Sequence, residues 1–304
     1  MHFWSIKKKW VGYVLYGILL TLGLLIICFP SGDMVSYLEA SAARMEPPLH
    51  LTVERLRPAL RLGLRLFQLE LALKDEPEKT LFQADTMLLR PGLWSLLKNS
   101  LKYHIDCDAY GGKIKGTIHF KESQTSSPFD SVAGLKGINM DQIPYLQELI
   151  GRNITGLLSG TVNYSGQYNL PLDGSGDADL TMVNGEVQLF APIPFLDIDQ
   201  LAFEKMAISL ALKKRLLRLT QLNFEGDQLQ GSLTGTIRLK DQLSKSSLDL
   251  KGKVSLSGDL TESLSEESAA ANLIRQRMTK GALSFAVYGT LEDPKIRFRQ
   301  ERKR

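Results

Sequence analysis

His104, Asp106 and His119 are the residues whose types could build a metal site. They share the polar side of two alternating stretches on either side of the pair Gly111-Gly112. A two-residue turn at this pair would place His104 across from His119, and two imidazoles with a carboxylate can bind zinc. The same polar side carries three cations, which oppose cation binding: Lys102, Lys113 and Lys115. We therefore interpret it as an ordinary solvated strand face and predict no metal site.

Motifs for other kinds of catalysis are absent from the sequence. It contains no G-x-S-x-G elbow, no G-x-x-x-x-G-K-[ST] phosphate loop and no H-E-x-x-H motif. The glycines of 174–176 are better explained by a turn than by nucleotide binding. The two cysteines, Cys28 and Cys107, fall on distant predicted elements and cannot form a disulfide or a metal site together. We predict no catalytic residue and no cofactor, and expect that the protein is not an enzyme.

The charge balance argues against nucleic acid as a partner. The chain has 37 basic and 33 acidic residues among 304, a net charge of +4. No motif for binding DNA or RNA concentrates these cations locally. We expect no nucleic-acid partner.

A membrane anchor is predicted near the N-terminus. The segment 10–29, from Trp10 to Phe29, has no charged residue and is about as long as the roughly 20 residues that a helix needs to cross a bilayer. Three lysines precede it and place the N-terminus in the cytoplasm by the positive-inside rule: Lys7, Lys8 and Lys9. We predict a cytoplasmic basic segment at 1–9, a transmembrane helix at 10–30 and an exported domain at 31–304.

The segment differs from a cleaved signal peptide and from a lipoprotein signal. A cleaved signal peptide usually has a shorter apolar stretch, and the small residues 40–42 that could mark a cleavage site come late. A lipoprotein signal ending at Cys28 would need a small residue where Ile27 stands. Both features favour an uncleaved anchor.

Alternation of apolar and polar residues predicts β-strands through most of the exported part. Clear examples are 101–109, 114–120, 229–239 and 248–256. Each has one apolar and one polar face, as in an antiparallel sheet. We predict that the apolar faces form a groove lined by Leu101, Tyr103, Ile105, Ile114, Ile118, Phe120, Leu229, Leu233, Ile237, Leu250, Val254, Leu256, Phe285 and Val287.

Two local features refine the strand prediction. In 61–73 the apolar parity switches between Leu66 and Phe67, which indicates a bulge or a bend. Glycine followed by threonine recurs within predicted strands, where glycine eases bending or close approach of backbones: Gly116, Gly160, Gly235 and Gly289.

Helices are predicted to be few. We expect short ones at about 33–45, 92–98 and 141–150 and a longer one at about 265–279, with a polar linker and possible domain boundary at 121–130. These helices cannot cover so much apolar sheet surface. The sheet must therefore curl over itself, close as a sandwich or hold something apolar from outside.

The end of the chain predicts an edge strand. In 287–298 two alternating segments are separated by Glu292, Asp293 and Pro294. Proline cannot donate to a strand ladder, so Pro294 fits the start of an edge strand that presents Ile296 and Phe298 and could bind a partner. The basic tail 295–304 could meet anionic headgroups or an acidic partner, although a solvated strand end is the better explanation.

This arrangement resembles the AsmA-like envelope proteins. The segments 84–97, 109–120 and 223–239 look most similar to the type II secretion system protein N (GspN) family. The resemblance implies an inner-membrane, single-pass protein of a Gram-negative bacterium with most of the chain in the periplasm. It also implies a mainly β fold, with a curved, largely antiparallel sheet and a few short helices after the anchor.

The resemblance further implies a role as an accessory or structural component of type II protein secretion. The expected partners are the inner membrane and secretion-system subunits. Larger AsmA-like relatives are thought to carry lipids along apolar grooves, so the alternative is a lipid-binding or lipid-transfer module with phospholipid in the groove. This chain is too short to cross a periplasm as a continuous conduit.

Overall fold

The computed structural model describes residues 28–45, 48–59, 63–92, 100–120, 128–167, 169–193, 198–227, 229–256 and 282–299, with scattered residues between 10 and 24. No helix within these residues is both long and apolar enough to cross a membrane. Much of the predicted span 10–30 lies outside the described residues, as do the predicted helices at about 92–98 and 265–279 and most of the linker 121–130.

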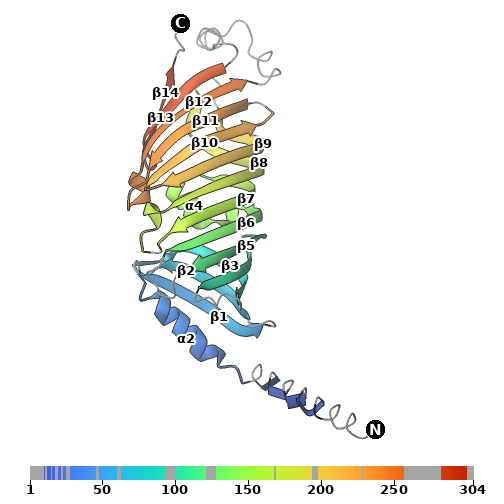
Figure 1. Cartoon of the computed structure of the whole chain (residues 1–304). Helices are drawn as coiled ribbons and strands as arrows, with labels where there is room; N and C mark the ends of the chain where they lie inside the picture. The colour runs from blue at the N-terminus through green and yellow to red at the C-terminus, as the bar shows by residue number, and fades with distance from the viewer. Residues whose placement is uncertain are drawn as a thin grey trace.

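One large antiparallel sheet dominates the fold, as the alternating pattern predicted (Figure 1). Its fourteen strands follow chain order, each hydrogen-bonded to the strands before and after it, so the sheet is a continuous meander. The strands are β1 (Leu49–Ala59), β2 (Gly63–Leu73), β3 (Glu76–Pro91), β4 (Leu101–Ala109), β5 (Gly112–Phe120), β6 (Phe129–Asn139), β7 (Ile154–Gly166), β8 (Ser175–Ile193), β9 (Ile198–Lys213), β10 (Leu216–Glu225), β11 (Leu229–Arg238), β12 (Ser247–Leu256), β13 (Ala282–Thr290) and β14 (Pro294–Arg299).

Short helices accompany the sheet. They are α2 (Ser31–Ala42), α4 (Pro144–Ile150) and the single 3-10 turns η1 (Met140–Gln142), η2 (Pro171–Asp173) and η3 (Leu243–Lys245). α2 begins two residues earlier than predicted because Pro30 takes the capping position, and its carbonyl accepts the amide of Met34 at 3.1 Å. The helix predicted at 141–150 is divided by Ile143 into η1 and α4, and it ends at the left-handed Gly151 as its sequence indicated.

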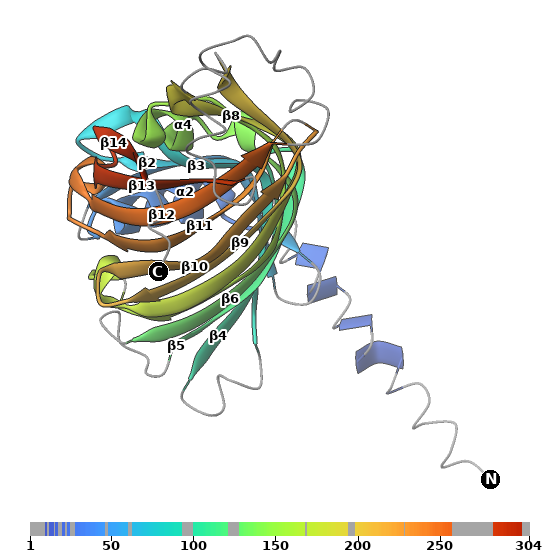
Figure 2. The same ribbon diagram turned by 90° about the horizontal axis from the view of Figure 1, so that it is seen from above.

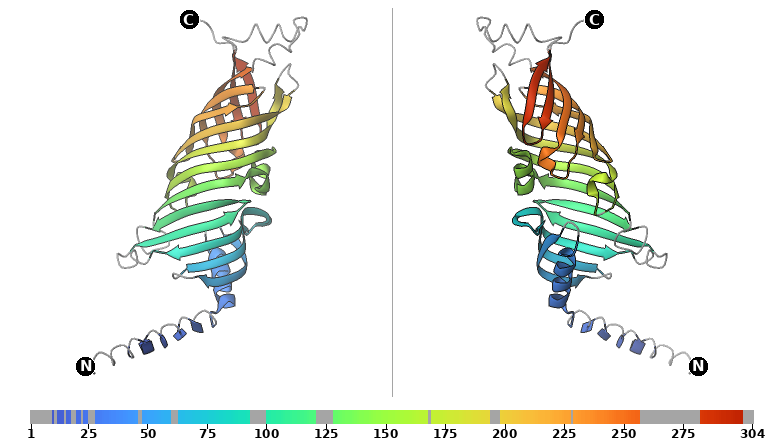
Figure 3. Two further views of the ribbon diagram at one scale, coloured as in Figure 1. Left: turned by 90° about the vertical axis from the view of Figure 1, so that its right-hand side faces the viewer. Right: turned by 90° about the vertical axis from the view of Figure 1, so that its left-hand side faces the viewer.

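The sheet is strongly curved. Seen along its long axis, its strands bend around one side of the molecule (Figure 2). The curvature brings β14 close to β8, six strands away in the pairing order. α2 packs beside β1 at the N-terminal end of the sheet, on the side shown in the right-hand view of Figure 3.

One face of the sheet is apolar from end to end. A single register row crosses thirteen strands, from β2 to β14, without meeting a polar side chain: Leu64, Leu89, Ile105, Gly116, Ala133, Val162, Ala178, Leu210, Leu219, Gly235, Leu250, Val287 and Ile296. The predicted one-sided strands therefore share one surface, which we call the apolar face.

Glycines on the apolar face let neighbouring backbones approach closely. At Gly235, with φ of +147°, a Cβ atom would collide with the carbonyl oxygen of Asp249 on the next strand. Gly160, with φ of +150°, has the same relation to Asp179. The prediction that these strand glycines serve close approach is confirmed at both positions.

The parity switch in β2 is also confirmed. Leu66 and Leu69 are both buried in the same cluster although they are three positions apart, which would place them on opposite faces of a regular strand. Gln68 between them has a positive φ of 47°, which turns the strand and returns the next side chain to the apolar face.

Candidate functional site: the apolar face

Three buried clusters fill parts of the apolar face. The first lies over β1 to β5, and Met34, Val35 and Leu38 of α2 pack against it. The second lies around β7 to β11, and the third extends to β14. α2 therefore closes the N-terminal end of the face with its own apolar stripe.

Most residues of the predicted groove belong to these clusters. Leu229, Leu250 and Val287 are buried, and others pack against the clusters: Ile105, Ile114, Leu233, Ile237, Val254 and Phe285. Leu229, Leu250 and Val287 are therefore part of the core, because the sheet curls enough to bring them against other apolar side chains. The six partly buried residues pack beside this core, and their place in the groove lining stays a prediction. The side chain of Leu256 lies outside the described residues.

The remaining lining residues lie over the middle of the sheet. Leu101, Tyr103, Ile118 and Phe120 are half-buried on β4 and β5 and belong to none of the three clusters. Phe129 on β6 and Tyr164 on β7 have the same exposure and lie on the same face, by the pairing Phe120 to Phe129 and Ser131 to Tyr164.

Four rings form a continuous row across these strands. The ring centroids are 6.2 Å apart between Tyr103 and Phe120, 5.8 Å between Phe120 and Phe129, and 5.5 Å between Phe129 and Tyr164. We call these four residues the aromatic row. Aromatic pairs at such distances attract each other, so the row presents a continuous apolar strip from β4 to β7.

Tyr164 fixes one end of the aromatic row. Its hydroxyl donates a hydrogen bond of 2.8 Å to the carbonyl oxygen of Pro171. Burial, with a smaller effect of the nearby Asp173 carboxylate, raises the pKa of Tyr164, so the phenol stays neutral at physiological pH. The ring is thereby held over Gly166 and Gly174, where a Cβ atom would collide with it.

η1 and α4 cover another part of the apolar face. Met140 is buried, and Ile143 and Leu146 pack against the second cluster. Glu148 of α4 forms an ion pair of 3.0 Å with Lys79 of β3. This segment therefore links the N-terminal strands to the middle of the sheet, while the aromatic row lies outside the cluster that it covers.

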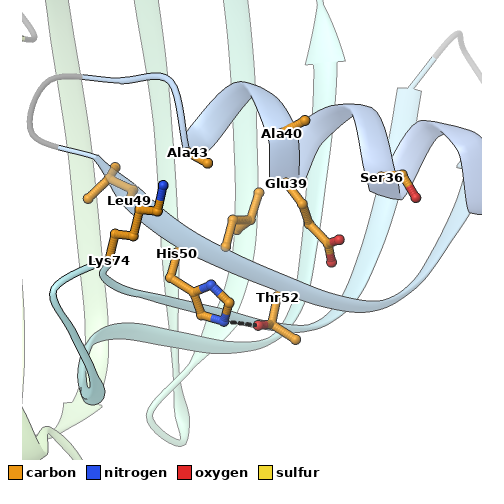
Figure 4. Close-up of a pocket in the computed structure, with 9 residues that line it drawn as sticks. Ser36, Glu39, Ala40, Ala43, Leu49, His50, Thr52 and Lys74 are labelled. Carbon is orange, nitrogen blue, oxygen red and sulfur yellow. Dashed lines mark hydrogen bonds between the residues drawn. The ribbon is translucent and has the colours of Figure 1, made fainter.

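A pocket of about 370 Å³ lies between α2 and β1 (Figure 4). Leu49 and Leu51 line it from the apolar side of β1, and His50 and Thr52 from the other side. Glu39 and Lys74 point into it from different elements, and His50 is hydrogen-bonded to Thr52 at 3.4 Å. The pocket is an open crevice at the sheet edge, separate from the aromatic row.

The hairpin that carries the histidines has a different register from the one predicted. Its turn residues are Tyr110 and Gly111, with φ of 52° and 70°, rather than Gly111-Gly112. His104 therefore lies opposite Thr117, and His119 lies opposite Lys102. The expected juxtaposition of the two histidines is wrong.

Long-range contacts explain this register. Tyr110 accepts the amide of Gln83 with its hydroxyl at 2.8 Å, and its ring meets Phe82 edge to face at 5.9 Å. Gly112 lies in the strand, where a Cβ atom would be 2.5 Å from the carbonyl oxygen of Gly137. Both constraints come from neighbouring strands and are invisible in the hairpin sequence.

The carboxylates of this hairpin are satisfied by cations on the solvated face. Asp108 pairs with Lys113 at 2.8 Å, and Asp106 lies 3.6 Å from Lys115. The hydrogen bonds from Lys113 and Thr86 lower the pKa of Asp108. Within the described residues no group of three His, Cys, Asp or Glu side chains is placed to hold a metal ion.

Phe129 and Tyr164 are site residues that the sequence prediction missed. Phe129 falls in the predicted linker 121–130, although it begins β6 directly opposite Phe120. Tyr164 lies in β7, four residues after Gly160. The signal that could have found them is one aromatic residue near the start or the finish of successive strands in alternation, because antiparallel pairing brings these positions to one edge of the sheet.

Pro294, Ile296 and Phe298 lie on the last strand of the sheet, as predicted. β14 begins at Pro294 and pairs with β13 alone in the part of the chain that the structure describes. Ile296 packs against the third cluster, and the Phe298 ring lies 6.5 Å from that of Phe285. The strand therefore completes the core on one face and leaves its outer edge unpaired by another described strand.

No protein-family model, curated protein or solved structure matches this chain. The residues and geometry of the apolar face are therefore the basis for a functional proposal.

Proposed function

We propose that this chain is an accessory or structural component of a type II protein secretion system, anchored in the bacterial inner membrane with its β domain in the periplasm. The observation that carries the proposal is the long meander sheet with one apolar face and a helix at its N-terminal edge. This architecture agrees with what the AsmA-like resemblance of the sequence implies. The charged N-terminal lysines and the apolar segment 10–29 supply the anchor.

A strain that lacks the gene tests this role. Removal of a secretion component should leave the exported substrate in the periplasm, since the substrate crosses the outer membrane only through the assembled apparatus. We expect the substrate to disappear from the medium and to return with a plasmid copy of the gene. Unchanged secretion without the gene would contradict the proposal.

Lipid binding is the second candidate function, and the aromatic row favours it. The four rings of the aromatic row are half-exposed on the apolar face. Fully burying a large apolar side chain is favourable by about 1.5 to 3 kcal/mol relative to leaving it exposed, so part of this free energy is still available to a ligand. A lipid acyl chain laid along the row would supply that burial without needing any charged partner.

Mass spectrometry of molecules that copurify with the intact protein from native membranes tests lipid binding. We expect phospholipid near one molecule per chain in the wild-type protein and less in a Phe120→Ser/Phe129→Ser variant. Val132→Ser is the matched control, because Val132 is 51 % exposed and lies on the opposite face of β6. Equal lipid content in all three proteins would exclude the aromatic row as the binding surface.

A further inference from the structure

The edge of the sheet at β14 lies beside a basic surface. The curvature of the sheet brings β14 near β8, but β13 is the one described strand that pairs with β14. On the solvated face, Lys295 and Arg297 of β14 are exposed, and so is Lys251 of β12. Lys251 and Arg297 lie in one register row, because Lys251 pairs with Ala286 and Ala286 with Arg297. We call these three residues the basic edge.

Two described carboxylates lie beside these cations. Asp293 lies 3.6 Å from Lys295, and Asp249 is two residues from Lys251 on the same face of β12. Arg297 forms no ion pair within the described residues. Among the described residues the basic edge therefore retains net positive charge at Arg297, next to the strand edge that no other described strand pairs with.

The other face of the same strand is apolar. Ile296 and Phe298 are half-buried and continue the apolar face to its last row. A strand added beside β14 would cover them with its own apolar side chains. Its alternate side chains would then lie next to Lys295 and Arg297.

A second copy of this chain does not fit this edge. Two β14 strands paired with each other would place cations opposite cations, which is unfavourable. β1, the other end of the sheet, is faced by α2 and carries the exposed Arg55 and Arg57. Charges on an edge strand select against wrong partners of this kind.

We propose that β14 binds an extended segment of a different protein by strand addition, and that this segment alternates apolar with acidic side chains. The segment needs to pair with six residues, the length of β14. The inference deepens the proposed secretion role and rests on it only for the compartment in which the partner is found. Peptide binding reports on the edge alone, so it can fail or succeed independently of secretion.

The test uses the intact protein in detergent and two synthetic peptides as long as β14. One alternates valine with glutamate and the other alternates valine with lysine. We expect the glutamate peptide to bind, by fluorescence anisotropy, and to slow hydrogen exchange of the β14 amides. The lysine peptide should not bind. Binding without protection of these amides, or equal binding of both peptides, would overturn the proposal.

Charge reversal supplies the decisive comparison. Lys295→Glu/Arg297→Glu should weaken binding of the glutamate peptide about tenfold and permit binding of the lysine peptide. Lys136→Glu/Arg218→Glu, which changes exposed cations on other strands, should bind like the wild type. If the reversed variant loses its β-sheet signal by circular dichroism, Lys295→Gln/Arg297→Gln should show a smaller change in the same direction. Unchanged peptide preference in the folded variants would contradict strand addition at the basic edge.

Discussion

At the scale of single residues, the charged groups of the β4–β5 hairpin lie on the solvated face. There Asp106 and Asp108 form ion pairs with lysines, and the central register row of the apolar face contains no charged residue. The histidine hairpin illustrates how far local sequence can be read. Its strands and the sidedness of its residues were predicted correctly. Its turn was not, because Tyr110 is fixed by Phe82 and Gln83 of another strand.

Cys107 should be chemically inert in the folded protein. It is 1 % exposed, and burial, with the nearby Asp108 and Asp106, raises the pKa of its thiol to about 11. The thiolate is therefore scarce at neutral pH, and a reagent cannot reach it. In a Cys28→Ser protein, we expect maleimide to label Cys107 only after denaturation. Rapid labelling of the native variant would show that the first cluster is open.

The strand glycines should be intolerant of a methyl group where backbones touch. Gly235→Ala should lower the free energy of unfolding by about 1 to 3 kcal/mol, because its φ is left-handed and its Cβ would meet Asp249. Gly134→Ala is the control, since its Cβ would have only the Lys115 oxygen nearby, at 3.8 Å. Urea denaturation measures both. Equal midpoints would mean that close approach does not require glycine in β11.

At the scale of elements, alternation identified strands and their sidedness, and glycines indicated tight approach. The pairing register of the strands was harder to predict from the sequence. In β10 the register shifts between Leu219 and Leu222, so that both keep the apolar face although parity alone would separate them. The position of α4 depends on contacts of Ile143, Leu146 and Glu148 with distant strands, which no local pattern encodes.

Aspartate substitutions on the two faces of β11 and β12 test which side chains of these strands point to the apolar face. Leu233 packs against the third cluster and Val254 against the second, so Leu233→Asp and Val254→Asp bury a charge and should cost several kcal/mol. Thr234 is exposed and lies opposite Lys251, so Thr234→Asp should change stability by less than about 0.5 kcal/mol. Limited proteolysis of the purified protein distinguishes them. Equal sensitivity of the three variants would refute the facing assignment.

At the scale of the whole molecule, the curvature of the sheet determines how much of the apolar face is buried. Sequence predicted a sheet with more apolar surface than its helices could cover. The structure fills much of that surface by bending the sheet until β14 approaches β8 and by placing α2 and α4 on it. The aromatic row lies outside the three clusters that this packing forms, and its position depends on the register of four successive strands.

The proposed topology makes a separate prediction for the intact chain. A single apolar segment preceded by three lysines should place the C-terminus in the periplasm. A reporter that is active only in the cytoplasm, fused after Arg304, should therefore be inactive. An active reporter at that position would contradict the inner-membrane anchor with a periplasmic domain.

The central claim is that this protein serves secretion through its apolar face. The most direct measurement is the amount of exported substrate in the medium of a strain whose chromosomal copy carries Phe120→Ser/Phe129→Ser, at wild-type abundance of the protein in the inner membrane. We predict that secretion falls to the level of the deletion strain, whereas the outer-face variant Val132→Ser secretes normally. Wild-type secretion by the aromatic-row variant, from a strain in which deletion abolishes secretion, would contradict the claim.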